Sequence, residues 1–155
     1  ISEDQAIIIE KRVNDAVLDG ASVLLGNKRD GALFAPTIVD KVCPTSELVA
    51  KETFGPIASI IRISNLDQAI KLIRQSPYRL AGSIATSDLE DADRLQRSIA
   101  VGQFSLNGPP GYRTEEAPFG GFGDSGNGEK EGVVMMTRAM RRLRTYYNHN
   151  SSTIS

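Results

Sequence analysis

Segments that favour strands alternate regularly with segments that favour helices along the middle of this chain. Asn65 caps one expected helix and Pro77 follows its end. Strands separated by helices of roughly 10–15 residues are typical of βαβ units. The sequence therefore predicts an α/β fold with a mostly parallel sheet and flanking helices. The alternating segments are residues 57–63, 66–75, 80–85, 88–99 and 101–106.

A further helix is expected at the beginning of the chain. Ser2 precedes two acidic residues, which is typical of a capped helix start, and Gly20 is a natural stop. Ile9, Val13 and Val17 recur at helical spacing and should form its apolar face.

Two strands should follow this helix. They are residues 21–25 and 34–42, and Pro36 within the second indicates an edge strand. The C-terminal part should contain a Gly/Pro-rich stretch at 107–128, a helix near 129–140 and a strand at 143–147. We therefore expect one structured portion, residues 1–147, followed by a polar tail, residues 148–155.

Composition narrows the possible partners. The 155 residues include 18 basic and 19 acidic side chains, for a net charge of -1. This balance gives no electrostatic reason to expect nucleic acid or an anionic membrane as a partner. No apolar run approaches the roughly 20 residues of a membrane span. The first residues do not resemble a signal peptide, and the lack of an initiator methionine suggests a processed or truncated product.

The chain has one cysteine, Cys43, and one histidine, His149. No internal disulfide can form, which favours a reducing compartment such as the cytoplasm. Cys43 follows an apolar strand and precedes Pro44, so we expect a partly buried structural residue rather than a nucleophile. His149 lies in the polar tail, without partners for a metal site or for acid–base chemistry.

Residues 121–126 match the G-x-G-x-x-G pattern of dinucleotide-binding loops. That loop requires a strand before it, a helix opening at it and an acidic residue about 20 positions later. Pro118 and Phe119 precede the pattern and Tyr146 occupies the later position, so the resemblance to a Rossmann loop is misleading. We expect these glycines to mark a crowded stretch of backbone instead.

Residues 51–56, K-E-T-F-G-P, lie between two expected strands, where α/β folds present functional groups. The Glu52 carboxylate can accept hydrogen bonds from two sugar hydroxyls, and Phe54 can offer a ring face. A simple turn would explain these residues equally well without further context.

That context is a second motif about fifty residues later: Asn107, then P-F-G-G at 118–121 and S-G at 125–126. Together the segments resemble the E-x-F-G-P and N…P-F-G-G-x-x-x-S-G motifs of the aldehyde dehydrogenase superfamily. Residues 81–86 and 101–103 also agree, so the resemblance extends from residue 1 to about residue 147.

The resemblance implies NAD(P)-dependent oxidation of an aldehyde by the full-length protein. Glu52 would hold the nicotinamide ribose hydroxyls, Phe54 would pack beside the nicotinamide, and Phe119 would line the substrate tunnel. The family's nucleophile, Rossmann domain and general-base glutamate lie upstream of the matched region, so no catalytic residue is expected in this chain and the chain alone should be inactive. Lys51 stands where the family often has an acidic residue, and either Glu129 or Glu131 could match its proton-relay glutamate.

The loop at 108–117 is where family members differ in substrate, and its P-G-Y-R sequence resembles the phosphonoacetaldehyde dehydrogenase subgroup. The resemblance implies that Arg113 binds an anionic substrate tail, a role that suits the planar fork of arginine. Pairing of Arg113 with Glu115 or Glu116 is the alternative.

Residues 143–147 resemble the family's subunit-bridging strand, which implies a homo-oligomeric parent. The alternative from another class is a stand-alone α/β binding or structural module that uses its glycine-rich loop to bind an anion or a partner subunit.

Overall fold

Helix α1 (Glu3–Leu18) opens the computed structural model, which describes residues 2–126, 128 and 132–149. The Ser2 hydroxyl accepts a hydrogen bond from the Gln5 amide at 3.2 Å, as the capping pattern predicted. Ile9 and Val13 are fully buried, as expected, but Val17 is 40% exposed and Ala16 is buried instead. The expectation for Val17 was wrong because repeated steps of four residues drift around a helix that has 3.6 residues per turn.

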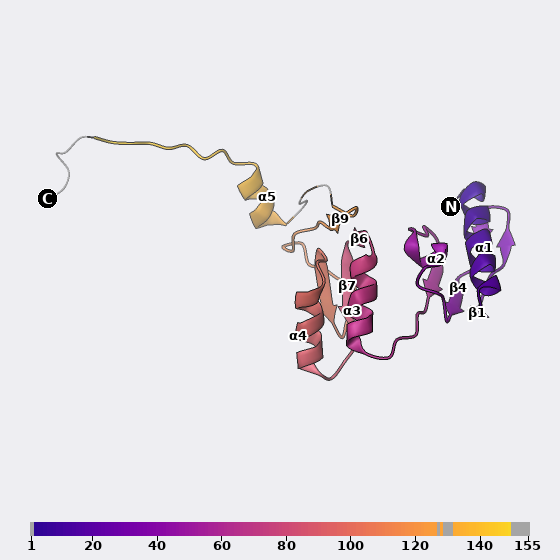
Figure 1. Cartoon of the computed structure of the whole chain (residues 1–155). Coiled ribbons are helices and arrows are strands. Elements are labelled where there is room, and N and C mark those ends of the chain that lie inside the picture. The colour runs from indigo at the N-terminus through magenta and orange to yellow at the C-terminus, as the bar shows by residue number, and fades with distance from the viewer. Residues whose placement is uncertain (1, 127, 129–131, 150–155) are drawn as a thin grey trace. The chain divides into compact units, whose positions relative to one another are not determined.

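A three-stranded sheet lies beside α1 (Figure 1). Its order is β1 (Ser22–Leu25), β4 (Thr37–Asp40) and β5 (Ile57–Ser59), with β1 antiparallel and β5 parallel to β4. Val39 of β4 is fully buried in the cluster that α1 covers. The other buried members of this core are Ile9, Val13, Ala16, Ala21, Phe34, Val42 and Leu48.

The strand expected at residues 34–42 is two elements. Phe34 ends a short hairpin, β2 (Arg29–Asp30) with β3 (Leu33–Phe34), and β4 begins only at Thr37. The edge position predicted for this strand was wrong, because β4 is the central strand of its sheet. Pro36 lies in the connection before β4, so its missing N–H does not interrupt the ladder.

A buried carboxylate fixes the end of β4. Both oxygens of Asp40 accept hydrogen bonds from Arg62, at 2.9 Å from Nε and 2.8 Å from Nη2. The Asp40 side chain is 9% exposed and also accepts the Lys41 amide. The hydrogen bonds from Arg62, followed by that of the Lys41 amide, hold the pKa of Asp40 below its ordinary value although burial acts against them.

Three helices begin at capping side chains: α2 (Glu47–Ala50), α3 (Leu66–Gln75) and α4 (Leu89–Ser98), after Ser46, Asn65 and Asp88. The prediction for α3 was correct at both ends. Helices α3 and α4 are joined by a hydrogen bond from Arg74 Nε to the Ser98 carbonyl at 2.7 Å and by an ion pair between Arg94 and Asp67. Helix α2 has only four residues and was not predicted from the sequence.

The chain divides into two compact units, residues 1–78 with 86–100 and residues 79–85 with 101–155. In the second unit, β7 (Ala81–Ile84) and β8 (Gln103–Leu106) pair in parallel. Its other elements are β9 (Phe122–Gly123) and α5 (Val133–Ala139), and β6 (Tyr78–Arg79) spans the boundary. The predicted α/β class is confirmed, with parallel pairs at β4–β5 and β7–β8 and antiparallel pairs at β1–β4 and β2–β3.

Of the C-terminal elements that were predicted, the helix is found and the strand is not. The helix near 129–140 is found as α5, although residues 129–131 lie outside the described part. The strand expected at 143–147 is absent from this described segment, since it has no paired neighbour to complete a ladder. The limit between residues 1–147 and a tail stays a prediction, because residues 150–155 are not described. No helix among the described residues is long and apolar enough to cross a bilayer.

The Asp40–Arg62 pair predicts how stability depends on pH. The pKa of Asp40 is lower in the folded state than the unfolded value of about 3.9, so the ionised carboxylate stabilises the fold above that pH. This contribution to the free energy of unfolding is lost as the pH falls through the folded-state pKa. Asp40→Asn should therefore lower the free energy of unfolding at pH 6, and the difference from the parent should shrink below about pH 4. Denaturant unfolding at several pH values measures this.

Arg62→Gln is the matched variant, because it removes the partner and keeps the carboxylate. It should remove most of the pH-dependent part of the stability, because Arg62 lowers the pKa of Asp40 more than the Lys41 amide does. A deficit in Asp40→Asn that is equal at pH 6 and pH 3 would show that the pair does not lower the pKa of Asp40.

Candidate functional site

The loop at residues 51–56 presents two side chains to solvent. Glu52 is exposed, and Phe54 is 72% exposed. Among the residues that the structure describes, the Glu52 carboxylate has no hydrogen-bond or ion-pair partner. The loop joins the core next to β4, since the Thr37 amide donates to the Pro56 carbonyl at 2.9 Å. A shallow hollow is lined by Glu52, Thr53, Phe54, Gly55 and Pro56.

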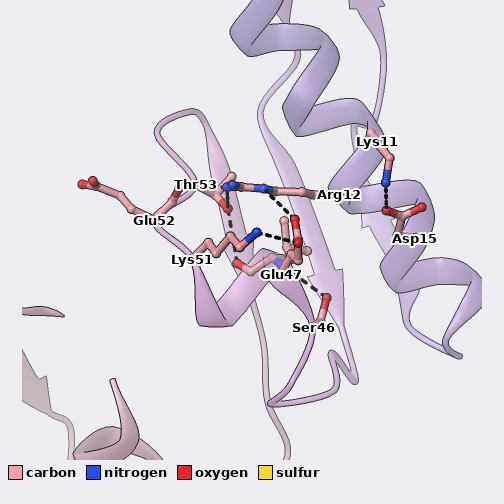
Figure 2. Close-up of polar contacts among 9 residues, drawn as sticks. Lys11, Arg12, Asp15, Ser46, Glu47, Lys51, Glu52 and Thr53 are labelled. Carbon is pink, nitrogen blue, oxygen red and sulfur yellow. Dashed lines mark hydrogen bonds and ion pairs between the residues drawn. The ribbon is translucent and has the colours of Figure 1, made fainter. Parts of the chain in front are cut away.

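This loop is held by its backbone and by one hydroxyl rather than by its two exposed side chains. Arg12 Nη1 of α1 donates to the Glu52 carbonyl at 2.8 Å, and Gln5 Nε2 of α1 lies 3.5 Å from the Phe54 carbonyl. The Thr53 hydroxyl lies 3.4 Å from the Leu48 carbonyl of α2. Figure 2 shows Glu52 extending away from these contacts. The loop is thus fixed while its carboxylate and its ring remain available.

Lys51 forms an ion pair with a residue of the neighbouring helix α2. Its Nζ donates to Glu47 Oε1 at 2.6 Å, one helical turn away (Figure 2). This hydrogen bond, with the charge of Lys51 and more weakly that of Arg12, lowers the pKa of Glu47 below its ordinary value. The cation that departs from the family pattern is therefore paired with Glu47.

The chemical groups that this loop exposes suit a dinucleotide better than a metal ion. A carboxylate supplies acceptors for a pair of sugar hydroxyls, and a phenyl ring packs against a planar heterocycle. Within the described residues, no group of three or more metal-binding side chains comes together. The residues present therefore fit the nicotinamide ribose that the family resemblance implies.

The second unit brings Arg113 and Phe119 together. The Arg113 guanidinium carbon lies 4.8 Å from the centre of the Phe119 ring, a cation–π contact. Arg113 is exposed and Phe119 is half-buried. Gln103 Nε2 of β8 donates to the Tyr112 carbonyl and so fixes the residue before Arg113. A hollow in the second unit is lined by Leu80, Ala81, Gln103, Gly111, Arg113, Pro118, Phe119 and Gly120.

Glycines in this unit allow separate segments of the backbone to lie in contact. A Cβ on Gly102 would lie 1.6 Å from the Gly120 carbonyl oxygen, and one on Gly126 would lie 2.2 Å from the Gly121 oxygen. The Ser125 hydroxyl accepts the Arg79 amide at 3.1 Å. No helix opens at residues 121–126, all of which are described. The expectation of crowded backbone rather than a Rossmann loop is confirmed.

Cys43 differs from its prediction in one respect. It is exposed rather than partly buried, because the chain leaves the sheet at this point while Val42 enters the core. A contact of 3.1 Å with the Thr45 hydroxyl lowers the pKa of Cys43 below its ordinary value. His149 is exposed and stacks on Tyr147, with ring centres 6.3 Å apart.

The candidate residues thus form two pairs. Glu52 and Phe54 belong to the first unit, and Arg113 and Phe119 belong to the second. Glu129 and Glu131, the alternatives for a proton-relay glutamate, lie outside the described residues.

A comparison with protein families matches residues 1–145 to the Aldehyde dehydrogenase family. The chain belongs to the aldehyde dehydrogenase family. The curated relatives include the sulfoacetaldehyde dehydrogenase of Neptuniibacter caesariensis, 36% identical over 94% of this chain and 32% of the relative. The 3-sulfolactaldehyde dehydrogenase of Priestia aryabhattai is 39% identical over 80% of this chain and 26% of the relative. The chain thus spans about a third or less of the length of these relatives.

Solved structures of this family share the fold. Aldehyde dehydrogenase 21 from Physcomitrella patens, in complex with the reaction product succinate, matches with a TM-score of 0.88 at 32% identity, over 99% of this chain and 32% of that one. The glyceraldehyde-3-phosphate dehydrogenase of Methanocaldococcus jannaschii, complexed with NADP, matches with a TM-score of 0.75 at 36% identity, over 86% of this chain and 28% of that one.

Proposed function

We propose that this chain is part of an NAD(P)-dependent aldehyde dehydrogenase that oxidises a small anionic aldehyde to the acid. The observation that carries the proposal is the loop at 51–56. It is fixed by its backbone, and it leaves the Glu52 carboxylate without a partner among the described residues. Family membership over residues 1–145 favours this enzyme over a stand-alone binding module.

Glu52 and Phe54 would hold the cofactor. The carboxylate would accept hydrogen bonds from the two nicotinamide ribose hydroxyls, and the exposed ring would pack beside the nicotinamide. The bound cofactor supplies the hydride acceptor of the oxidation. Relatives include an NADP-dependent enzyme of Pisum sativum and a betaine aldehyde dehydrogenase structure with NAD+, which leaves both cofactors open for this protein.

Glu52→Gln in the full-length enzyme should weaken the cofactor and spare the aldehyde. The amide keeps the shape but loses the charge, and charge-assisted hydrogen bonds contribute about 1.5–3 kcal/mol each. We expect a higher cofactor KM or a lower kcat, with an aldehyde KM that is nearly unchanged, in steady-state kinetics.

Glu90→Gln, at an exposed position near the start of α4, is the matched control and should leave kcat and the KM values of cofactor and aldehyde unchanged. An altered aldehyde KM with unchanged cofactor KM and kcat in Glu52→Gln would exclude contact between Glu52 and the cofactor.

Arg113 is the candidate for the anionic end of the substrate. Arg113 is exposed and its guanidinium lies over the Phe119 ring. The residue also lines the hollow of the second unit, together with Gln103 of β8. Sulfoacetaldehyde and 3-sulfolactaldehyde, the substrates in the names of two relatives, each carry a sulfonate. The guanidinium of arginine can form two hydrogen bonds with a sulfonate, a phosphonate or a carboxylate. We therefore propose that the substrate is anionic and leave the individual aldehyde open.

Arg113→Ala should separate charged from neutral aldehydes. We expect KM for phosphonoacetaldehyde or sulfoacetaldehyde to rise by at least about tenfold, because truncation strands the substrate charge. KM for lactaldehyde, a small neutral aldehyde, should stay nearly constant.

Little change for either class would favour pairing of Arg113 with Glu115 or Glu116 in water, since exposed pairs contribute about 0–1 kcal/mol. Equal losses on both classes would mean that Arg113 only supports the loop. Either result removes the substrate proposal and leaves the family assignment intact.

The 155-residue chain by itself should not oxidise aldehydes. Cys43, its one thiol, follows β4 and contacts Thr45, and the family's nucleophile matches no position here. An assay of the purified chain with aldehyde and NAD or NADP should show no turnover. Turnover that is lost on Cys43→Ala would overturn this expectation.

We further propose a cytoplasmic homo-oligomer. The single cysteine favours a reducing compartment, and residues 143–147 resemble the family's subunit-bridging strand, which would complete its ladder on a partner. Ultracentrifugation of the full-length protein measures the oligomeric state. The mass of the native protein, measured by mass spectrometry, distinguishes the two hypotheses. A mass of about one domain would favour the stand-alone module, and a much larger mass would favour the enzyme.

A further inference from the structure

Arg12 is a poorly exposed cation that reaches a loop forty residues away. It lies on α1 between the core residues Ile9 and Val13, and its side chain is 14% exposed. Its Nη1 donates to the Glu52 carbonyl at 2.8 Å and to the Thr53 hydroxyl at 3.0 Å (Figure 2). Two contacts on consecutive residues fix both the position and the orientation of that peptide.

The contacts of Arg12 spare the Glu52 side chain. The guanidinium binds the carbonyl of Glu52, whereas the carboxylate extends away from it (Figure 2). A direct ion pair would have neutralised the carboxylate and occupied its acceptors. Through the backbone, Arg12 instead decides where the carboxylate lies and leaves its acceptors available.

The Thr53 hydroxyl extends this support to α2. It accepts from Arg12 and lies 3.4 Å from the Leu48 carbonyl, a suitable acceptor for its own proton. Leu48 is buried in the core. The loop is thereby tied on one side to α1 and on the other to α2, two elements that pack on the same core.

Glu47 balances the charges around the loop. Its Oε2 lies 3.8 Å from Arg12 Nε, and its Oε1 lies 2.6 Å from Lys51 Nζ. Arg12 Nε is buried and has no hydrogen-bond partner among the described residues, so Glu47 compensates it by charge alone. Arg12 of α1 and Lys51 of the loop therefore both form ion pairs with Glu47 and not with the Glu52 carboxylate.

We propose that Arg12 is a positioning residue for the cofactor. It holds the backbone of residues 52–53 so that the Glu52 carboxylate meets the ribose hydroxyls. This inference rests on the proposed function, because it requires Glu52 to bind the cofactor. Arg12 itself contacts neither cofactor nor substrate in this proposal.

The test compares Arg12→Gln with Lys11→Gln in the full-length enzyme. Lys11 is the exposed neighbour on α1, and its ammonium pairs with Asp15 at 2.6 Å, away from the loop. We expect the dissociation constant of NADH or NADPH, measured by equilibrium fluorescence, to rise roughly tenfold in Arg12→Gln and to stay within about twofold in Lys11→Gln. The aldehyde KM should stay nearly constant in both.

Arg12→Lys keeps the cation but not the fork, so it should bind the cofactor with intermediate affinity. This variant also serves if Arg12→Gln does not fold. Cofactor affinity equal to that of the parent in a folded Arg12 variant, with only a lower thermal midpoint, would overturn the proposal, because it would show a structural role alone.

A double-mutant cycle with Glu52→Gln decides whether Arg12 acts through Glu52. The loss from Arg12→Gln should largely disappear when Glu52 is already glutamine. Additive losses would overturn the positioning role and leave the proposed function intact. No loss of cofactor affinity from Glu52→Gln alone would overturn the proposed function, and the positioning role with it.

Discussion

The packing of α1 on β4 builds the buried core beside which the loop at 51–56 lies. Ile9, Val13 and Val39 are fully buried at this contact, and large-to-small changes in such positions cost about 2–5 kcal/mol. Because the helix is fixed by this apolar face, its flank carries Arg12 and Gln5 to the loop at 51–56. The same burial that builds the core therefore also places the candidate cofactor carboxylate.

Other apolar surface in the chain stays uncovered. Leu24 and Leu25 of β1 are 60% and 56% exposed, although strand residues of this kind usually pack on a neighbour. The chain spans about a third or less of the length of its curated relatives. Exposed strand faces suit a piece of a larger fold, in which further chain would cover them.

The two candidate pairs depend on different physical devices. Glu52 and Phe54 are presented by a loop whose carbonyls are held from a helix. Arg113 and Phe119 meet in a loop whose backbone at Gly120 approaches Gly102 closely because Gly102 carries no side chain. Hydrogen-bond donors set the first arrangement and the absence of Cβ atoms permits the second.

Short-range signals were enough to predict the capped helices after Asn65 and Asp88, the α/β class and the motif around Glu52. Tertiary structure decided what depends on long-range contacts. It made β4 a central strand, exposed Cys43 and left residues 143–147 without a strand partner among the described residues. It also joined Arg12 to the Glu52 carbonyl, forty residues apart, because only packing of α1 on the sheet brings that helix to the loop.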